Sequence, residues 1–166
     1  MDFKNIKIIV SEIDGIITNG AKPIDNMGYT MFKYYYENDF EAINELKKFF
    51  TFVFLADDSE INYNLMRKRN IPTYFSTNKL SKLDILINKI MYRYHAKPEN
   101  LLYIGNKITD IPCMQYAEIS FTTNKALMKV KHTANMVLDV SPGFGVIVNV
   151  TDILYAEITS RQRKII

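Results

Sequence analysis

The chain has 166 residues, 48% of them hydrophobic and 23% charged, so it can bury the core of one domain and is too apolar for intrinsic disorder. Its formal net charge of +3 is small and its lysines are scattered, which argues against a nucleic-acid-binding protein. The single cysteine, Cys113, excludes an internal disulfide and is typical of the reducing cytoplasm. No apolar run approaches the roughly 20 residues that span a bilayer. We therefore expect one cytoplasmic domain over residues 1–166, with no signal peptide, membrane partner or nucleic-acid partner.

The first expected element is a buried parallel strand over the apolar run 6–10. Directly after it the chain passes through Glu12 and Asp14 into a glycine. In open α/β sheets, ligands bind beyond the carboxyl ends of the strands, so both carboxylates lie where chemistry is expected. The alternative for Asp14 is a solvated turn residue.

Residues 20–36 predict a β-hairpin, because two β-prone segments flank Asp25-Asn26-Met27-Gly28, which has the residues of a tight turn. Its second strand, Met31 to Tyr36, is strongly aromatic. These rings either cover the core of their own domain or form an oligomer interface.

Strands and helices alternate through the rest of the chain. The expected strands are 51–55, 72–75, 101–104, 119–121 and 136–138. Three helices are expected to begin at caps: Asn38 or Asp39, Ser59 (with the helix running to about Arg69), and the Ser81/Asp84 capping box. Three more are expected from about Asp110, from about Lys125 to Lys131, and after Gly143. Such alternation predicts an α/β fold with a mainly parallel sheet that helices cover on both faces.

Five stretches, in order along the chain, together resemble the capless branch of the HAD superfamily. That branch holds the 3-deoxy-D-manno-octulosonate 8-phosphate (KDO 8-phosphate) phosphatases and the C-terminal domain of animal-type CMP-sialic acid synthetases. The stretches are 13–20 with the hairpin, 81–83, 98–105, 110–114 and 142–146. The resemblance implies a HAD-like Rossmannoid, three-layer α/β/α fold with a hairpin insert after the first strand. It also implies an aspartyl-phosphate mechanism with Mg²⁺.

The first two motifs of that family are altered. Glu12 stands where the family has its nucleophilic aspartate, and its extra methylene moves the oxygen by roughly 1–1.5 Å, enough to cost on the order of 100-fold in rate. Asp14, the acid and base, is retained. At the phosphate-binding positions Leu55 and Ala56 replace Thr-Gly, and Asp57 and Asp58 follow, whose charges repel an anion.

The third motif of the family has a phosphate-binding lysine, which is retained here as Lys82, with Lys79 as an alternative. The other interpretation of Lys82 is a solvated side chain at the start of a helix with no role in the site. At the fourth motif Asn106 and Lys107 replace two acids. The remaining metal positions are Glu12, Asp14 and Asn106, and Lys107 repels a divalent cation, so we expect an internal ammonium in place of the metal. Asp110, the last acid, either belongs to the site or caps the following helix.

Because catalytic residues that act as one unit fail as one unit, these changes favour a catalytically impaired protein that binds no cofactor. Its expected role is an oligomeric scaffold, a homotetramer assembled through the hairpin as the resemblance implies, or a partner in acidic-sugar (KDO or sialic acid) metabolism. One alternative is an active Mg²⁺-dependent phosphatase of a KDO 8-phosphate-like sugar phosphate that uses Glu12, with Asp14, Asp57 or Asp58 rebuilding the metal site. Another is a binding module that holds an anionic sugar with Lys82 and Lys107.

Overall fold

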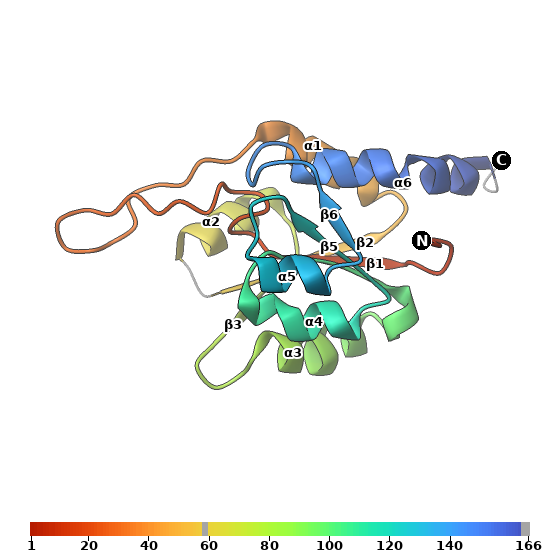
Figure 1. Cartoon of the computed structure of the whole chain (residues 1–166), viewed down its shortest axis with the longest axis horizontal. Coiled ribbons are helices and arrows are strands. Elements are labelled where there is room, and N and C mark those ends of the chain that lie inside the picture. Colours follow the sequence, from red (N-terminus) through yellow and green to blue (C-terminus); the bar gives the residue numbers. More distant parts are fainter. Residues whose placement is uncertain (58–59, 164–166) are drawn as a thin grey trace.

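The computed structural model describes residues 1–57 and 60–163. Within these ranges six strands, all paired in parallel, form one sheet in the order β3-β2-β1-β4-β5-β6 (Figure 1). The strands are β1 (Ile8–Ser11), β2 (Thr51–Asp57), β3 (Thr73–Ser76), β4 (Leu101–Ile104), β5 (Ile119–Thr123) and β6 (Met136–Leu138). The predicted parallel sheet is confirmed, and β2 and β5 extend two residues beyond the predicted ends.

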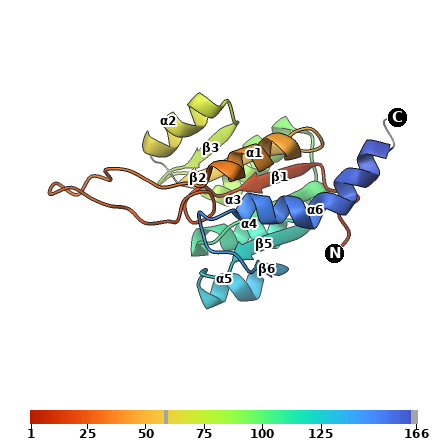
Figure 2. The same ribbon diagram turned by 90° about the horizontal axis from the view of Figure 1, so that it is seen from above.

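Helices cover both faces of the sheet, which confirms the three-layer α/β/α prediction. One face carries α1 (Glu37–Leu46), α2 (Glu60–Arg69) and α6 (Val146–Arg163), and Figure 2 shows α1 and α6 side by side. The other face carries α3 (Lys82–Ile85), the π-helical segment Leu86–Met91, α4 (Ile111–Tyr116) and α5 (Met128–Thr133). Short 3₁₀ turns, Pro98–Asn100 and Ile108–Asp110, flank β4. No helix in the described ranges has both the length and the apolar character needed to cross a bilayer.

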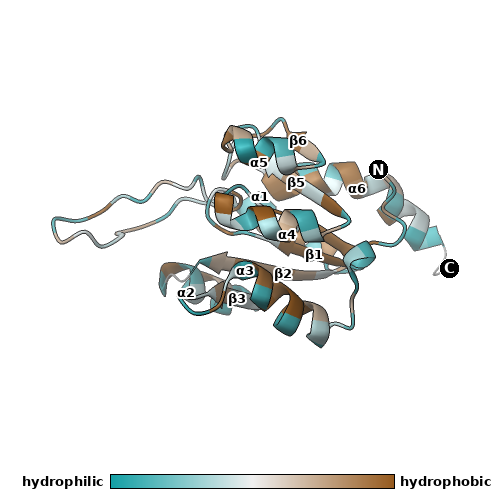
Figure 3. Ribbon diagram, turned by 60° about the horizontal axis from the view of Figure 1, so that its bottom comes forward, coloured by the Kyte–Doolittle hydropathy of each residue, from teal (hydrophilic) through white to brown (hydrophobic). Residues whose placement is uncertain are grey.

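Each strand supplies side chains to two separate cores. In β1, Ile9 packs beneath α1 and α6, whereas Ile8 and Val10 pack against the opposite helices. This period of two is the geometry of a strand, and burial of both faces gives the continuous apolar run read from the sequence (Figure 3, where the central strands are brown).

The Ser81/Asp84 capping box is confirmed: the Ser81 hydroxyl accepts from the Asp84 amide, and the Asp84 carboxylate accepts from the Ser81 amide. The helix does not continue as one α-helix, however, because it changes to π-helical hydrogen bonding over Leu86–Met91.

The predicted cap of α1 is wrong. The helix starts at Glu37 after Tyr36, which makes no side-chain cap, and Asp39 is fully buried inside the first turn. Its Oδ1 instead accepts from the backbone amides of Ile147 (2.7 Å) and Val148 (3.1 Å), so it caps α6, which packs beside α1. The Ser59 cap of α2 lies outside the described residues.

The hairpin forms a long arm that projects from the body (Figure 1), but it is barely a β-ladder. Its turn is present, since the Gly28 amide donates to the Asp25 carbonyl at 3.1 Å. Strand pairing is limited to isolated bridges, Ile24 with Thr30 and Tyr35 with Thr18. The two predicted strands are therefore wrong as regular strands, because the arm has no neighbouring layer on which to bury a face.

Candidate functional site

Three carboxylates from different strands converge on one buried lysine at the carboxyl edge of the sheet. Glu12 follows β1, Asp57 ends β2 and Asp110 follows β4. Lys82 Nζ donates to Glu12 Oε2 and to Asp110 Oδ1 (2.7 Å), and it lies 3.6 Å from Asp57 Oδ1. Glu12 and Asp110 are fully buried, and the Lys82 side chain is 1% exposed. We call these residues, with Lys107, the carboxylate cluster.

Lys107 places a second ammonium in the carboxylate cluster. Its Nζ lies 2.6 Å from Asp57 Oδ2 and 3.5 Å from Glu12 Oε2. Lys107 is the residue for which the sequence predicted an internal ammonium in place of the metal. Two ammonium groups thus face three carboxylates within hydrogen-bonding or ion-pairing distance.

The loop after β4 is built around Asp110. Its Oδ2 accepts from the backbone amides of Asn106 (3.0 Å) and Lys107 (2.9 Å), and its Oδ1 accepts from the Tyr103 hydroxyl (2.9 Å). Gly105 permits this fold-back, because a Cβ there would meet the Asp110 side chain at 2.6 Å. Asp110 makes no side-chain cap on α4, so the capping alternative is wrong.

A second cluster forms around Asp14, beside the first. Lys33 Nζ donates to both Asp14 oxygens (2.7 and 2.8 Å) and to Asn62 Oδ1 (2.9 Å). Asp14 also accepts from the Thr18 hydroxyl (3.1 Å) and the Asn62 amide (3.3 Å). Its side chain is 5% exposed, so the alternative of a solvated turn residue is wrong.

Sequence reasoning missed four residues that contact the site carboxylates: Lys33, Asn62, Thr18 and Tyr103. Lys33 carried one signal, since it is the only charged residue in the aromatic stretch Met31 to Tyr36. Thr18 and Tyr103 lie in two of the stretches that carry the resemblance but were given no role in the site, and Asn62 carried no signal, because a polar residue within a helix usually faces solvent.

Burial and charge set the protonation of the carboxylate cluster. Burial raises the pKa of Glu12, and the charge of Asp110 raises it further, against the lowering effect of Lys82 and Lys107. Burial lowers the pKa of Lys82, but the charges of Asp110 and Glu12 outweigh it and the net pKa is raised. The pKa of Asp57 is lowered, because the Lys107 hydrogen bond and both ammonium charges exceed the effect of burial.

Asp14 is held ionised by the hairpin. Burial alone would raise its pKa, but the Lys33 hydrogen bonds and charge lower it below the usual range.

Several expected site residues lie elsewhere. The Leu55 and Ala56 side chains are fully buried in the two hydrophobic cores, so neither side chain takes part in the site. Lys79 is exposed, and the third-motif lysine is therefore Lys82. Asn106 packs on Gly15, whose φ of +85° and lack of a Cβ allow an approach that an alanine would block at 1.8 Å. Asp58 lies outside the described residues.

No family model matches the sequence, and no curated protein matches it significantly. Solved structures do match. The cobalt-bound deoxy-D-mannose-octulosonate 8-phosphate phosphatase of Haemophilus influenzae superposes with a TM-score of 0.82 at 23% identity, over 93% of this chain and 90% of that one. The Moraxella catarrhalis KDO 8-phosphate phosphatase, in complex with magnesium, phosphate and KDO, gives 0.83 at 16% identity, over 98% and 95%. A Streptomyces avermitilis protein named as a HAD-family hydrolase gives 0.82 at 24% identity, over 95% and 90%.

The residues of this chain do not fit a divalent cation in the arrangement seen. In the described ranges, no group of three or more His, Cys, Asp and Glu side chains is placed to hold a metal ion. Asn106 Oδ1 is buried and has no hydrogen-bond partner among the described residues, but the neighbouring carboxylates are taken up by Lys82, Lys107 and Lys33. An ammonium beside these oxygens repels Mg²⁺, which needs oxygen ligands in octahedral order. The superpositions show that the chain has the fold of the HAD-family KDO 8-phosphate phosphatases, and its own lysines are paired to the carboxylates at the carboxyl edge of its sheet.

Proposed function

We propose that this protein is a catalytically silent HAD-fold protein that works as a homo-oligomeric scaffold or partner in acidic-sugar metabolism. The observation that carries the proposal is the pairing of Lys107 and Lys82 with the cluster carboxylates, 2.6 Å from Asp57 and 2.7 Å from Asp110.

The geometry around Glu12 disfavours nucleophilic attack. Its Oε1 accepts from the backbone amides of Ile13 (2.8 Å) and Asp14 (3.3 Å), and its Oε2 accepts from Lys82. The side chain is fully buried, and burial raises its pKa. A carboxylate whose two oxygens are both hydrogen-bonded, and which no solvent reaches, is poorly placed to attack an incoming phosphorus.

Asp14 is equally unsuited to acid–base work. Lys33 occupies both of its oxygens and lowers its pKa, whereas an efficient general acid or base has a pKa near the working pH. Asp57 adds a negative charge where a phosphate ester would dock, at 42% side-chain exposure. The anionic-sugar module gains no support either, because Lys82 and Lys107 are already neutralised by carboxylates.

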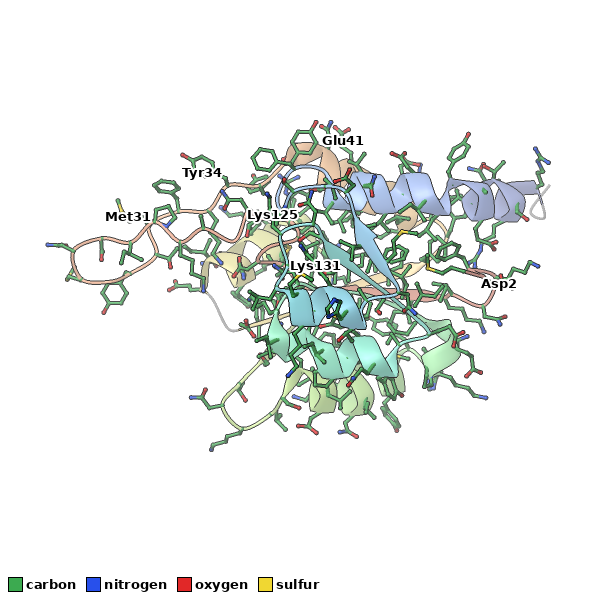
Figure 4. All side chains as sticks on the ribbon, in the orientation of Figure 1. Asp2, Met31, Tyr34, Glu41, Lys125 and Lys131 are labelled. Atoms are coloured by element: carbon green, nitrogen blue, oxygen red, sulfur yellow. The ribbon has the colours of Figure 1, made fainter. Side chains whose placement is uncertain are left out.

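The arm supports the scaffold role. Its side chains Met27, Tyr29, Met31 and Tyr34 are each more than 60% exposed, and Figure 4 shows Met31 and Tyr34 on the projecting arm. Exposed apolar side chains in such number mark an interaction surface, and a second copy of the chain is the proposed partner. Because the large apolar side chains of the aromatic segment 31–36 are each at least 40% exposed, they cover little of their own core, which favours an interface over self-covering. The link to KDO-type sugars comes from the names of the similar structures.

The test combines an activity assay with a size measurement. Phosphate release from KDO 8-phosphate and from p-nitrophenyl phosphate is measured with millimolar Mg²⁺ for the wild type and for Glu12→Gln, and we expect both proteins to stay at the blank rate. Light scattering on a sizing column is expected to give the mass of a tetramer. Mg²⁺-dependent release that disappears in Glu12→Gln would instead establish the phosphatase alternative, and a monomer at micromolar concentration would contradict the scaffold.

A further inference from the structure

A hollow of about 710 Å³ opens where β3 begins, at the opposite edge of the sheet from the carboxylate cluster. It lies between Lys47, which directly follows α1, the end of α2, and Arg93 and Tyr94, which follow the π-helical segment. Asn70, in the left-handed region at φ +51°, turns the chain out of α2 there, a conformation that asparagine tolerates. The volume falls in the range of small-molecule sites.

The charged side chains around this hollow are all positive. Lys47, Arg67 and Arg93 line it from three separate parts of the chain, and no Asp or Glu of residues 1–57 and 60–163 lines it. Among the ion pairs of residues 1–57 and 60–163 none includes these three, although their neighbours are paired: Lys48 with Glu45 at 2.7 Å, and Arg69 with Glu37. Three cations left without carboxylates around one hollow favour an anionic ligand.

Aromatic and apolar groups complete the lining. Tyr74 and Tyr94 are half-buried, and behind them the floor of the hollow is closed by the core side chains Met66 (1% exposed) and Ile71 (7%). Both phenols line the same hollow, and burial, followed by the Tyr74 phenol, raises the pKa of Tyr94. Aromatic faces of this kind stack on planar rings, and guanidinium groups bind phosphate oxygens in a bidentate manner.

We propose that this hollow binds an organic phosphate that carries a flat ring system, such as a nucleoside diphosphate. The phosphates contact Lys47, Arg67 and Arg93, and the ring lies against Tyr74 and Tyr94. A bare inorganic anion would leave the tyrosines and the apolar surface unused, and an uncharged aromatic would leave the three cations unneutralised. The site is separate from the carboxylate cluster, so it stands or falls independently of the function proposed above.

Isothermal titration of the full chain with ADP, adenosine and pyrophosphate tests this proposal. We expect saturable ADP binding, with adenosine and pyrophosphate each at least roughly tenfold weaker, because each lacks one half of the recognised chemistry. The double variant Arg67→Gln/Arg93→Gln should weaken ADP binding by roughly tenfold or more. Lys68→Gln is the matched control, because this exposed lysine at the same helix end does not line the hollow and its loss should leave binding unchanged.

Three results would overturn the proposal. One is the absence of saturable heat up to about 5 mM ADP. Another is equal affinity for pyrophosphate and ADP, which would remove the role of the ring. The third is an equal loss of binding in Lys68→Gln and in the double variant, which would reduce the effect to general surface charge.

Discussion

Lys82→Met tests whether buried ion pairs hold the carboxyl edge of the sheet together. The Lys82 side chain is 1% exposed, and its partners Glu12 and Asp110 are fully buried. Without its ammonium the two carboxylates face each other, with only Lys107 near Glu12 at 3.5 Å. Removing one partner of a buried pair costs about 3–5 kcal/mol, a large part of the roughly 5–15 kcal/mol that stabilises a domain. Since 1 kcal/mol shifts the Tm of a chain of this size by about 2–4 °C, the expected fall in Tm is about 6–20 °C.

Urea and thermal unfolding at pH 7, followed by circular dichroism, measure this loss. Lys48→Met is the control, because Lys48 and Glu45 form an ion pair in which both side chains are 59% exposed, and its loss should cost less than about 1 kcal/mol. The deficit of Lys82→Met should shrink as the pH falls toward about 4, since Glu12, whose pKa burial already raises, then takes up a proton in the folded state. A Lys82→Met protein that loses no more stability than Lys48→Met would refute the reasoning.

Three further changes probe other contacts. Lys33→Met should release the arm, so that chymotrypsin cleaves within residues 21–36 faster, whereas Lys22→Met on the same arm should leave the cleavage rate unchanged. Because Lys33 lowers the pKa of Asp14, the wild-type contact is complete above about pH 4 and is lost as the pH falls below it, and hydrogen exchange of the arm amides measures this loss. Asp39→Ala should lose about 0.5–2 kcal/mol of unfolding free energy in urea, because the cap of α6 is missing, whereas Asp39→Asn keeps the acceptor oxygen. Because burial raises the pKa of Asp39, the wild type should lose stability relative to Asp39→Asn as the pH rises through about 4. A stability difference between the two proteins that stays constant with pH would contradict this. Lys107→Asp exchanges the internal ammonium for a carboxylate. If the site so created binds Mg²⁺ with a Kd of about 1 mM, the Tm of this variant should rise by about 3–6 °C in 10 mM Mg²⁺. The absence of any rise would count against Lys107 as the cation that blocks metal binding.

The fold could be predicted because the strands are buried on both faces. Such strands read as short apolar runs, and parallel connections bring their carboxyl ends to one edge. The residues just after those runs, Glu12, Asp57 and Lys107, therefore converge as the strand order requires. Lys82 joins them because the capping box fixes the start of α3.

The arm and its contacts could not be predicted in the same way. The sequence signals a turn at Asp25–Gly28, but whether the flanking segments pair depends on a neighbouring layer that the pattern does not reveal. Lys33 reaches Asp14 only because the base of the arm folds back across the sheet edge. Asp39 shows the same limit: an acid in the first turn of a helix has the pattern of a local cap, whereas burial directs it to the start of a helix more than 100 residues later.

The central claim is that the chain's own lysines occupy the place of a metal. Isothermal titration with Mg²⁺, alone and with orthovanadate as a phosphate mimic, tests it most directly, with Lys107→Asp as the comparison. The wild type is expected to give no saturable heat up to about 10 mM Mg²⁺, whereas Lys107→Asp is expected to bind. Saturable binding of Mg²⁺ and vanadate to the wild type, lost in Glu12→Gln, would contradict the account.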